Sequence, residues 1–194
     1  MEADNMNKIL VVVDMQNDFI DGVLGTPEAQ AIVPKVVEKI REWNDYVVTT
    51  YDFHTDDYYL DSQEGQRLPI KHCIADTYGM ELNTEIEEAF LEKEERTSYF
   101  KIGFGSMELA AELSSAIYNP FTIDAGFNID EIHLCGLCTD ICVISNAIIL
   151  KSFCPEVRIV VDASCCAGTT PEAHETALKA MRQCQIDIEN WEGN

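Results

Sequence analysis

Four runs of consecutive apolar, mostly β-branched residues are spaced along the chain. They are 8–14 (KILVVVD), 45–52 (DYVVTTYD), 131–136 (EIHLCG) and 157–163 (VRIVVDA). Each run ends in a small or acidic residue. This pattern is typical of short strands that are buried in a parallel sheet.

Helical patterns occupy most of the segments between these runs. They cover 28–43, 106–117, 139–152 and 171–184, which follow Pro27, Gly105, Gly136 and Thr170. The alternation predicts an α/β fold, a doubly wound, Rossmann-like parallel sheet of about six strands with helices on both faces. A length of 194 residues suits one domain, and we expect it to span 1–194.

The charge of the chain is strongly acidic. Thirteen Lys and Arg against thirty-five Asp and Glu leave a formal net charge of -22. Such a chain repels phosphate backbones and anionic lipids, so we expect no nucleic-acid partner and no membrane partner. The acidic stretch 85–95 is expected to be solvated surface, and the charge says little about a reaction.

The N-terminus and the cysteines point to an intracellular protein. MEADNMNKILVVVDMQ begins with acidic residues and has only a short apolar run, which fits neither a signal peptide nor a membrane helix. We therefore expect a cytoplasmic location. Eight cysteines in such a chain predict reduced thiols, most of them small apolar residues of the core.

Three of the expected strands end at residues that can carry chemistry. The first ends at Asp14, the second at Asp52, and the run 131–136 leads into Cys138 and Cys142 of CTDIC. An aspartate at a strand end can also cap a turn. Ligands of doubly wound sheets bind at the carboxyl ends of strands, so the three ends together favour a shared site.

Cys142 is the candidate nucleophile. The next helix is expected to begin near Thr139 or Asp140, whose side chains can accept hydrogen bonds from the free backbone N–H groups of the first turn. Cys142 then lies in the first turn of this helix, where the helix dipole is expected to lower the pKa of the thiol. The free backbone N–H groups of the same turn can bind an oxyanion. Asp14 is the candidate base and Lys101, between aromatic residues of YFKIGF, the candidate cation. Lys101 can also be read as a surface lysine that extends past Phe100.

Other readings of the cysteines and of the chain stay open. Cys135 and Cys138 form a Cys-x-x-Cys pair of the kind found in thioredoxin-like proteins, although Cys135 ends an apolar strand and is expected to point into the core. A zinc clip could draw on His133, Cys135, Cys138 and Cys142, but no second pair has structural-zinc spacing. An acidic scaffold that binds a partner without chemistry is the non-enzyme alternative.

The chain resembles a known family of enzymes. VVVDMQNDF, YDFH, YFKIGF and CGLCTDICV occur in the order and spacing of the isochorismatase-like cysteine hydrolases, and the chain is similar to their nicotinamidase branch from about residue 8 to 185. The resemblance implies a triad of Asp14, Lys101 and Cys142 that forms a thioester with an amide substrate. It also implies a cis peptide before Cys138 and an oxyanion hole made of the backbone N–H groups of Cys138 and Cys142.

A second group of residues suggests a metal site. Asp52, His54 and His72 are of the types that a divalent transition metal prefers, although each His alone could be an ordinary loop residue. The resemblance implies that they bind zinc, iron or manganese, zinc being the first expectation, and that the pyridine nitrogen of a substrate takes the open position. Glu64 is the candidate fourth ligand, direct or through water, because no third histidine precedes LPIKHC. Its alternative is a solvated loop acid.

The resemblance also suggests the substrate and its contacts. Phe19 matches an aromatic residue that stacks on the substrate ring, Phe104 is a candidate for the opposite wall, and Leu68 and Ile70 replace the family's usual Trp-Pro-Pro type segment. The implied activity is hydrolysis of nicotinamide to nicotinate and ammonia in NAD salvage. The alternative is a relative that hydrolyses another small amide or ureido compound. A homo-oligomer is implied as well.

Overall fold

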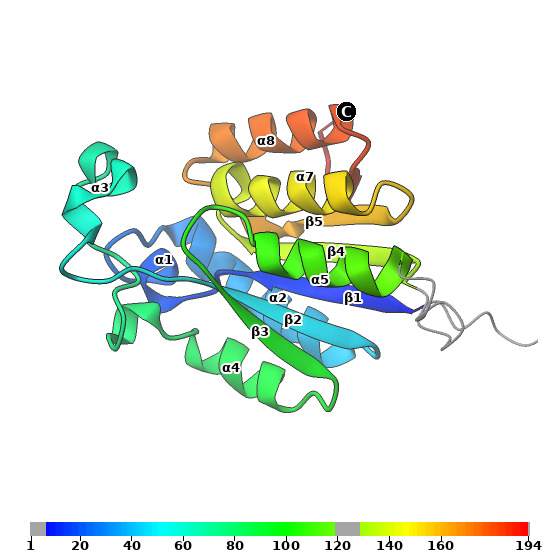
Figure 1. The fold of residues 1–194 in the computed structure, drawn as a ribbon, viewed down its shortest axis with the longest axis horizontal. Coiled ribbons are helices and arrows are strands. Elements are labelled where there is room, and N and C mark those ends of the chain that lie inside the picture. The colour runs from blue at the N-terminus through cyan, green and yellow to red at the C-terminus, as the bar shows by residue number, and fades with distance from the viewer. Residues whose placement is uncertain (1–6, 119–128, 194) are drawn as a thin grey trace, which may run out of the picture.

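Six parallel strands form one sheet in the order β3-β2-β1-β4-β5-β6 (Figure 1). The structure is a computed structural model that describes residues 7–118 and 129–193. The strands are β1 (Lys8–Val13), β2 (Tyr46–Asp52), β3 (Arg96–Lys101), β4 (Glu131–Leu137), β5 (Arg158–Ala167) and β6 (Asp187–Glu189). The prediction of a doubly wound α/β sheet is confirmed.

Helices cover both faces of this sheet. The helices of eight or more residues are α2 (Pro27–Glu42), α4 (Thr84–Leu91), α5 (Met107–Tyr118), α7 (Ile144–Phe153) and α8 (Pro171–Gln183). α2 and α4 pack together on one face, and α5, α7 and α8 pack on the other. Two of the helices begin as the sequence suggests, because Thr26 and Thr170 cap α2 and α8 and a proline follows each cap.

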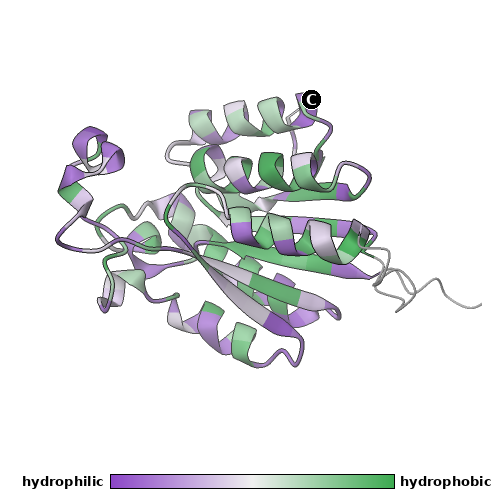
Figure 2. Ribbon diagram, in the orientation of Figure 1, coloured by the Kyte–Doolittle hydropathy of each residue, from purple (hydrophilic) through white to green (hydrophobic). Residues whose placement is uncertain are grey.

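The apolar runs form the centre of the sheet. All seven residues of β4 are buried, and β1 is buried from Ile9 onward. Figure 2 shows β1 largely in the green of hydrophobic residues. These two strands pair directly, with Val13 opposite Gly136. A Cβ on Gly136, which has φ of 117°, would lie 2.1 Å from the Val13 carbonyl oxygen. Glycine is therefore required where β4 leaves the sheet toward the residues that follow it.

The glutamates of the acidic stretch 85–95 are all exposed, as expected, but the stretch also contributes apolar side chains to the core. Its first half belongs to α4, which buries Ile86, Ala89 and Phe90. These positions have the spacing of one helical face, and that face packs on α2. The glutamates of the segment occupy the opposite face.

Short elements follow the carboxyl ends of β1 and β2. They are α1 (Asn17–Ile20), the 3₁₀ turns η1 (Tyr59–Asp61) and η2 (Tyr78–Met80), and α3 (Gln63–Arg67). The segment carrying η1 and α3 extends away from the sheet at its carboxyl edge (Figure 1). Across residues 7–118 and 129–193, no helix has the length and apolar character needed to cross a membrane.

Candidate functional site

Asp14, Lys101 and Cys142 meet at the carboxyl edge of the sheet. The Lys101 Nζ lies 2.7 Å from the Asp14 Oδ2 and 3.4 Å from the Cys142 Sγ. All three residues are at least 95 % buried. Lys101 contacts both the carboxylate of Asp14 and the thiol of Cys142. The three predicted residues thus form one contact group, and Lys101 is not a surface lysine.

Asp14 is positioned by the register of two neighbouring strands. It follows β1 with φ of 47°, and its backbone N–H donates to the Thr50 carbonyl oxygen at 3.2 Å. The Thr50 hydroxyl in turn donates to Asp14 Oδ1 at 2.7 Å. Thr50 lies opposite Val13 in the sheet, so its side chain is placed beside the carboxylate that follows Val13.

Lys101 connects Asp14 to a second carboxylate. It ends β3 opposite Asp52, and its Nζ lies 3.4 Å from Asp52 Oδ1. Burial alone would lower the pKa of Lys101, but the adjacent carboxylates of Asp14 and Asp52 outweigh burial and raise it. Lys101 is therefore a permanently charged ammonium between two acids.

Cys142 lies in a π-helical turn, η3 (Thr139–Val143), which precedes α7. The predicted capping is wrong: Cys138 is the N-cap and no side chain caps the turn. The Thr139 hydroxyl contacts His174 Nδ1 at 2.8 Å, and Asp140 accepts from the backbone N–H and hydroxyl of Thr169. These contacts join η3 to the start of α8. The Leu137–Cys138 peptide is cis, as the resemblance implies.

The pKa expected for the nucleophile was also wrong in direction. Burial raises the pKa of the Cys142 thiol well above its ordinary value, and the charge of Asp14 raises it further. Burial also raises the pKa of Asp14, against the influence of Lys101. The thiol at rest is therefore protonated, and it depends on an adjacent base rather than on a helix terminus.

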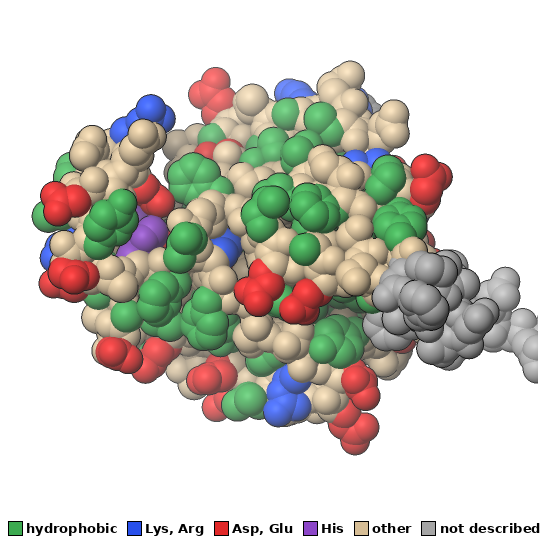
Figure 3. Space-filling model, viewed as in Figure 1, with side chains coloured by type: hydrophobic (Ala, Val, Ile, Leu, Met, Phe, Trp, Pro, Cys, Tyr) green, Lys and Arg blue, Asp and Glu red, His purple; other side chains and the backbone are tan. Residues whose placement is uncertain are grey.

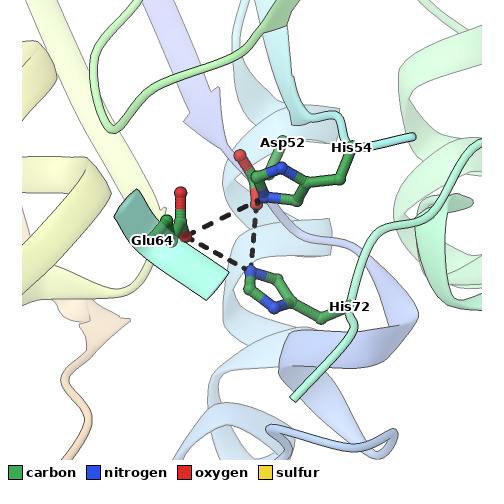
Figure 4. Close-up of side chains that lie close together, drawn as sticks. All are labelled: Asp52, His54, Glu64 and His72. Atoms are coloured by element: carbon green, nitrogen blue, oxygen red, sulfur yellow. Dashed lines mark hydrogen bonds and ion pairs between the residues drawn. The ribbon is translucent and has the colours of Figure 1, made fainter. Parts of the chain in front are cut away.

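Asp52, His54, Glu64 and His72 form a second cluster beside the first (Figure 4). One ligand atom from each lies within 4.8 Å of all the others. The Asp52 Oδ2 is 3.0 Å from His54 Nε2 and 3.3 Å from His72 Nε2, and the Glu64 Oε1 is 3.9 and 3.6 Å from the same nitrogens. The side chains point toward one another from three separate segments.

This donor set fits a divalent metal ion. Two imidazole nitrogens and two carboxylates are ligands of transition metals. Burial opposes ionisation of Asp52, but hydrogen bonds from His54 and His72 lower the pKa of Asp52 strongly, so it is a carboxylate. His72 Nδ1 donates to the Ile70 carbonyl oxygen at 2.9 Å, which leaves Nε2 directed at the cluster. Among the described residues, no other group of this kind was found.

Gln16 and Asp18 hold this cluster in place, and sequence reasoning assigned neither of them. The Gln16 side chain accepts from the Asp52 backbone N–H at 2.8 Å and donates to its carbonyl oxygen at 2.9 Å. Asp18 Oδ2 accepts from the Cys73 backbone N–H at 2.8 Å, which fixes the residue after His72. Both residues lie within the DMQNDF motif, so this motif was the sequence signal that could have identified them.

A cavity of about 460 Å³ opens beside both clusters. Its walls are mainly apolar, and the candidate substrate residues line it: Phe19, Leu68, Phe104, Cys138 and Cys142, together with Asp52, Glu64 and His72. The rings of Phe19 and His72 lie 5.5 Å apart. Figure 3 shows a hollow between the segment that carries α3 and the body of the molecule, with histidine at its base. Ile70 is exposed and does not line the cavity.

The rival cysteine sites do not form. His133 Nε2 pairs with Glu131 at 2.8 Å, at the opposite end of β4 from Cys138. Cys135 is fully buried, so it is not the exposed thiol that a thioredoxin-like pair needs. All eight cysteines are free thiols, and five besides Cys142 are buried.

Comparison with known proteins agrees with this geometry. The isochorismatase domain model matches residues 8–192. A nicotinamidase/pyrazinamidase of Mycobacterium tuberculosis is 25% identical over 186 residues, which are 93% of this chain and 97% of that protein. The crystal structure of the nicotinamidase PncA from Bacillus subtilis has a TM-score of 0.75 and 28% identity, covering 94% of this chain and 99% of the other.

A third neighbour is the pyrazinamidase of Pyrococcus horikoshii in complex with zinc. Its TM-score is 0.74 and its identity 26%, covering 95% of this chain and 99% of the other. The family model covers nearly the whole chain, and the structural matches cover a similar share of it. The chain therefore belongs to the isochorismatase family.

Proposed function

We propose that the protein is an amidohydrolase that converts nicotinamide to nicotinate and ammonia. One observation carries this proposal: Cys142, which Lys101 links to Asp14, and three of the four metal-ligand residues line the same apolar cavity. The similarity to nicotinamidases over more than nine-tenths of the chain supports the choice of amide.

Acylation begins with proton transfer from Cys142 to Asp14. Lys101 stabilises the anionic pair that results, because it contacts both groups. The Cys142 sulfur attacks the amide carbon, and the backbone N–H groups of Cys138 and Cys142 bind the oxyanion. The C–N bond breaks as Asp14 returns the proton to the leaving nitrogen, which departs as ammonia. A thioester remains on Cys142.

Deacylation uses the same groups with water as the nucleophile. Asp14 takes a proton from water, the new C–O bond forms at the thioester carbon, and the C–S bond breaks. The proton held by Asp14 returns to the Cys142 sulfur, which restores the thiol. The carboxylic acid formed loses its proton to solvent, and nicotinate leaves the cavity.

The ring is held at the opposite end of the cavity. Asp52, His54, His72 and Glu64 would bind Zn²⁺, and iron or manganese fits the same donors. When bound, the ion supplies a Lewis-acidic position for the pyridine nitrogen. Phe19 lines the cavity beside His72 and provides an apolar surface for the ring, with Leu68 and Phe104 as further walls.

The test compares nicotinamide with benzamide, which has the same amide but no ring nitrogen. Purified protein loaded with zinc should release ammonia from nicotinamide and produce nicotinate, and its kcat/KM for benzamide should be lower by tenfold or more, an order-of-magnitude estimate. An equal kcat/KM for both amides would contradict the proposed role of the metal cluster in binding the ring nitrogen. Ammonia release only from ureido compounds would place the chain in another branch of the family.

A further inference from the structure

We propose that Phe104 is the residue that limits the size of the substrate. It separates the cavity described above from a second one, so that the site accepts a single ring and excludes ring amides with a bulky substituent. This inference rests on the proposed function and names the substrate class that the site rejects.

The second cavity adjoins the substrate site, because the two share part of their lining. It has a volume of about 620 Å³, and three residues line both cavities: Glu64, Arg67 and Phe104. These three side chains therefore form the partition between the two spaces. Without the partition, the combined space would be large enough for a ligand much bigger than one pyridine ring.

Of the three, Phe104 is the rigid apolar part of the partition. Glu64 belongs to the metal-ligand cluster, and Arg67 is an exposed, long side chain at the end of α3 that can rotate into solvent. Phe104 has only two side-chain torsions, and its ring is about half exposed. Removal of this ring opens the partition with the least effect on the proposed metal site.

Asn146 holds the backbone of Phe104 next to the nucleophile. The Asn146 side chain donates to the carbonyl oxygens of Phe104 at 3.3 Å and Cys142 at 2.8 Å, and it accepts from the Ser106 N–H at 2.9 Å. Asn146 is 1% exposed. One buried amide side chain therefore fixes the backbone of Phe104 relative to the backbone of Cys142.

The lining of the second cavity indicates what it would accept. Its walls include the rings of Phe53, Tyr58 and Tyr59 and the side chain of Ile102. Aromatic and aliphatic walls suit an aryl substituent. The class excluded by Phe104 is therefore pyridine carboxamides that carry a second ring.

The first experiment measures kcat/KM of the zinc-loaded protein for nicotinamide and for its 5-phenyl and 6-phenyl derivatives. Phe104→Ala should raise the ratio of aryl-substituted to unsubstituted substrate by about tenfold or more. Two matched controls should leave the ratio unchanged. Phe100→Ala removes an exposed ring that lines neither cavity, and Ile102→Ala changes only the second cavity.

The second experiment does not depend on the substrate. Cys142 is alkylated with iodoacetamide or with the bulkier N-(1-naphthyl)iodoacetamide, and fragmentation mass spectrometry assigns the label to Cys142. Phe104→Ala should raise the rate of alkylation by the bulky reagent about tenfold relative to the rate with the small one. Phe104→Leu, which serves as the test if the alanine variant fails to fold, should give a smaller increase in the same ratio.

The outcomes separate this inference from the proposed function. An unchanged alkylation ratio in the folded Phe104 variants, or an equal change in Phe100→Ala, would overturn the partition. If wild-type protein releases no ammonia from nicotinamide while the alkylation ratio changes as expected, the proposed substrate is wrong and the partition stands.

Discussion

Burial determines how the thiol of Cys142 can react. It raises the pKa of Cys142 and of Asp14, so the thiol keeps its proton until Asp14 accepts it during the attack on a substrate. We expect Asp14→Asn to lower kcat for nicotinamide about 10²- to 10⁴-fold, because the amide cannot accept the proton. Steady-state ammonia release measures this effect. Asp21→Asn, which changes an exposed carboxylate, is the control, and a kcat for Asp14→Asn within a factor of about three of wild type would contradict the role.

The residues that touch the chemistry could be predicted from the sequence, but their supports could not. Asp14, Lys101 and Cys142 follow strands or begin a helix, and their types suggest chemistry at those places. Gln16 and Asn146 make hydrogen bonds to backbone groups that are far away in the sequence or belong to a loop. An amide side chain has no local pattern that reveals such partners.

At the scale of elements, the turn that carries Cys142 is joined to α8. Asp140 accepts from Thr169, and the adjacent Thr170 caps α8 through the Ala173 N–H at 3.1 Å. We expect Thr170→Ala to lower the free energy of unfolding by about 1 kcal/mol, with kcat changed less than about threefold. Urea unfolding measures the free energy of unfolding, and ammonia release from nicotinamide measures kcat.

The matched control for the cap is Thr176→Ala within the same helix, whose hydroxyl donates to the Glu172 carbonyl oxygen. It should cost less than about 0.5 kcal/mol. A Thr170 variant as stable as the control would show that the cap contributes nothing, and the junction with Asp140 would then hold the start of α8.

Long elements were predictable and short ones were not. The strands at the centre of the sheet are apolar runs, and the helices 28–43 and 171–184 carry proline and threonine signals at their starts. α3 has five residues and β6 has three, too few for a periodic signal. The expected helix 139–152 was only partly right, because tertiary contacts of Thr139 and Asp140 replace local capping and the first turn is π-helical.

At the scale of the whole molecule, an ion cluster stabilises the end of the sheet opposite the site. Glu131 contacts Lys8, His133 and Arg158, each at 2.8 Å. Hydrogen bonds from His133, Lys8 and Arg158 lower the pKa of Glu131 from its ordinary 4.5 to about 2. A carboxyl with a lowered folded-state pKa stabilises the fold above its ordinary pKa, and this contribution is lost as the pH falls through the folded-state value.

The Glu131→Gln variant tests this contribution. At pH 6 the variant should be less stable than wild type, and the difference should shrink as the pH falls from about 4.5 toward about 2. Urea midpoints across this range measure the difference, with Glu156→Gln as an exposed control. A difference that is constant across the range would mean that Glu131 contributes through packing rather than charge.

The metal cluster also links distant parts of the chain. Asp52 and His54 lie at the end of β2, whereas Glu64 and His72 come from the segment that extends beyond the sheet. An ion that binds only the folded chain raises its stability, so chelation should lower Tm and zinc should restore it. Asp52→Asn should respond to neither treatment. If the Tm of the wild type is equally insensitive and no metal co-purifies, the four residues do not form a metal site.

The most direct test of the account is ammonia release from nicotinamide by zinc-loaded wild type and by Cys142→Ala. Metal content and circular dichroism are checked in both proteins. The account predicts steady release by the wild type and loss of turnover in a folded Cys142→Ala variant. Turnover that survives in the variant would contradict the thioester mechanism, and wild-type protein that is folded, metal-loaded and inactive on nicotinamide would contradict the proposed substrate.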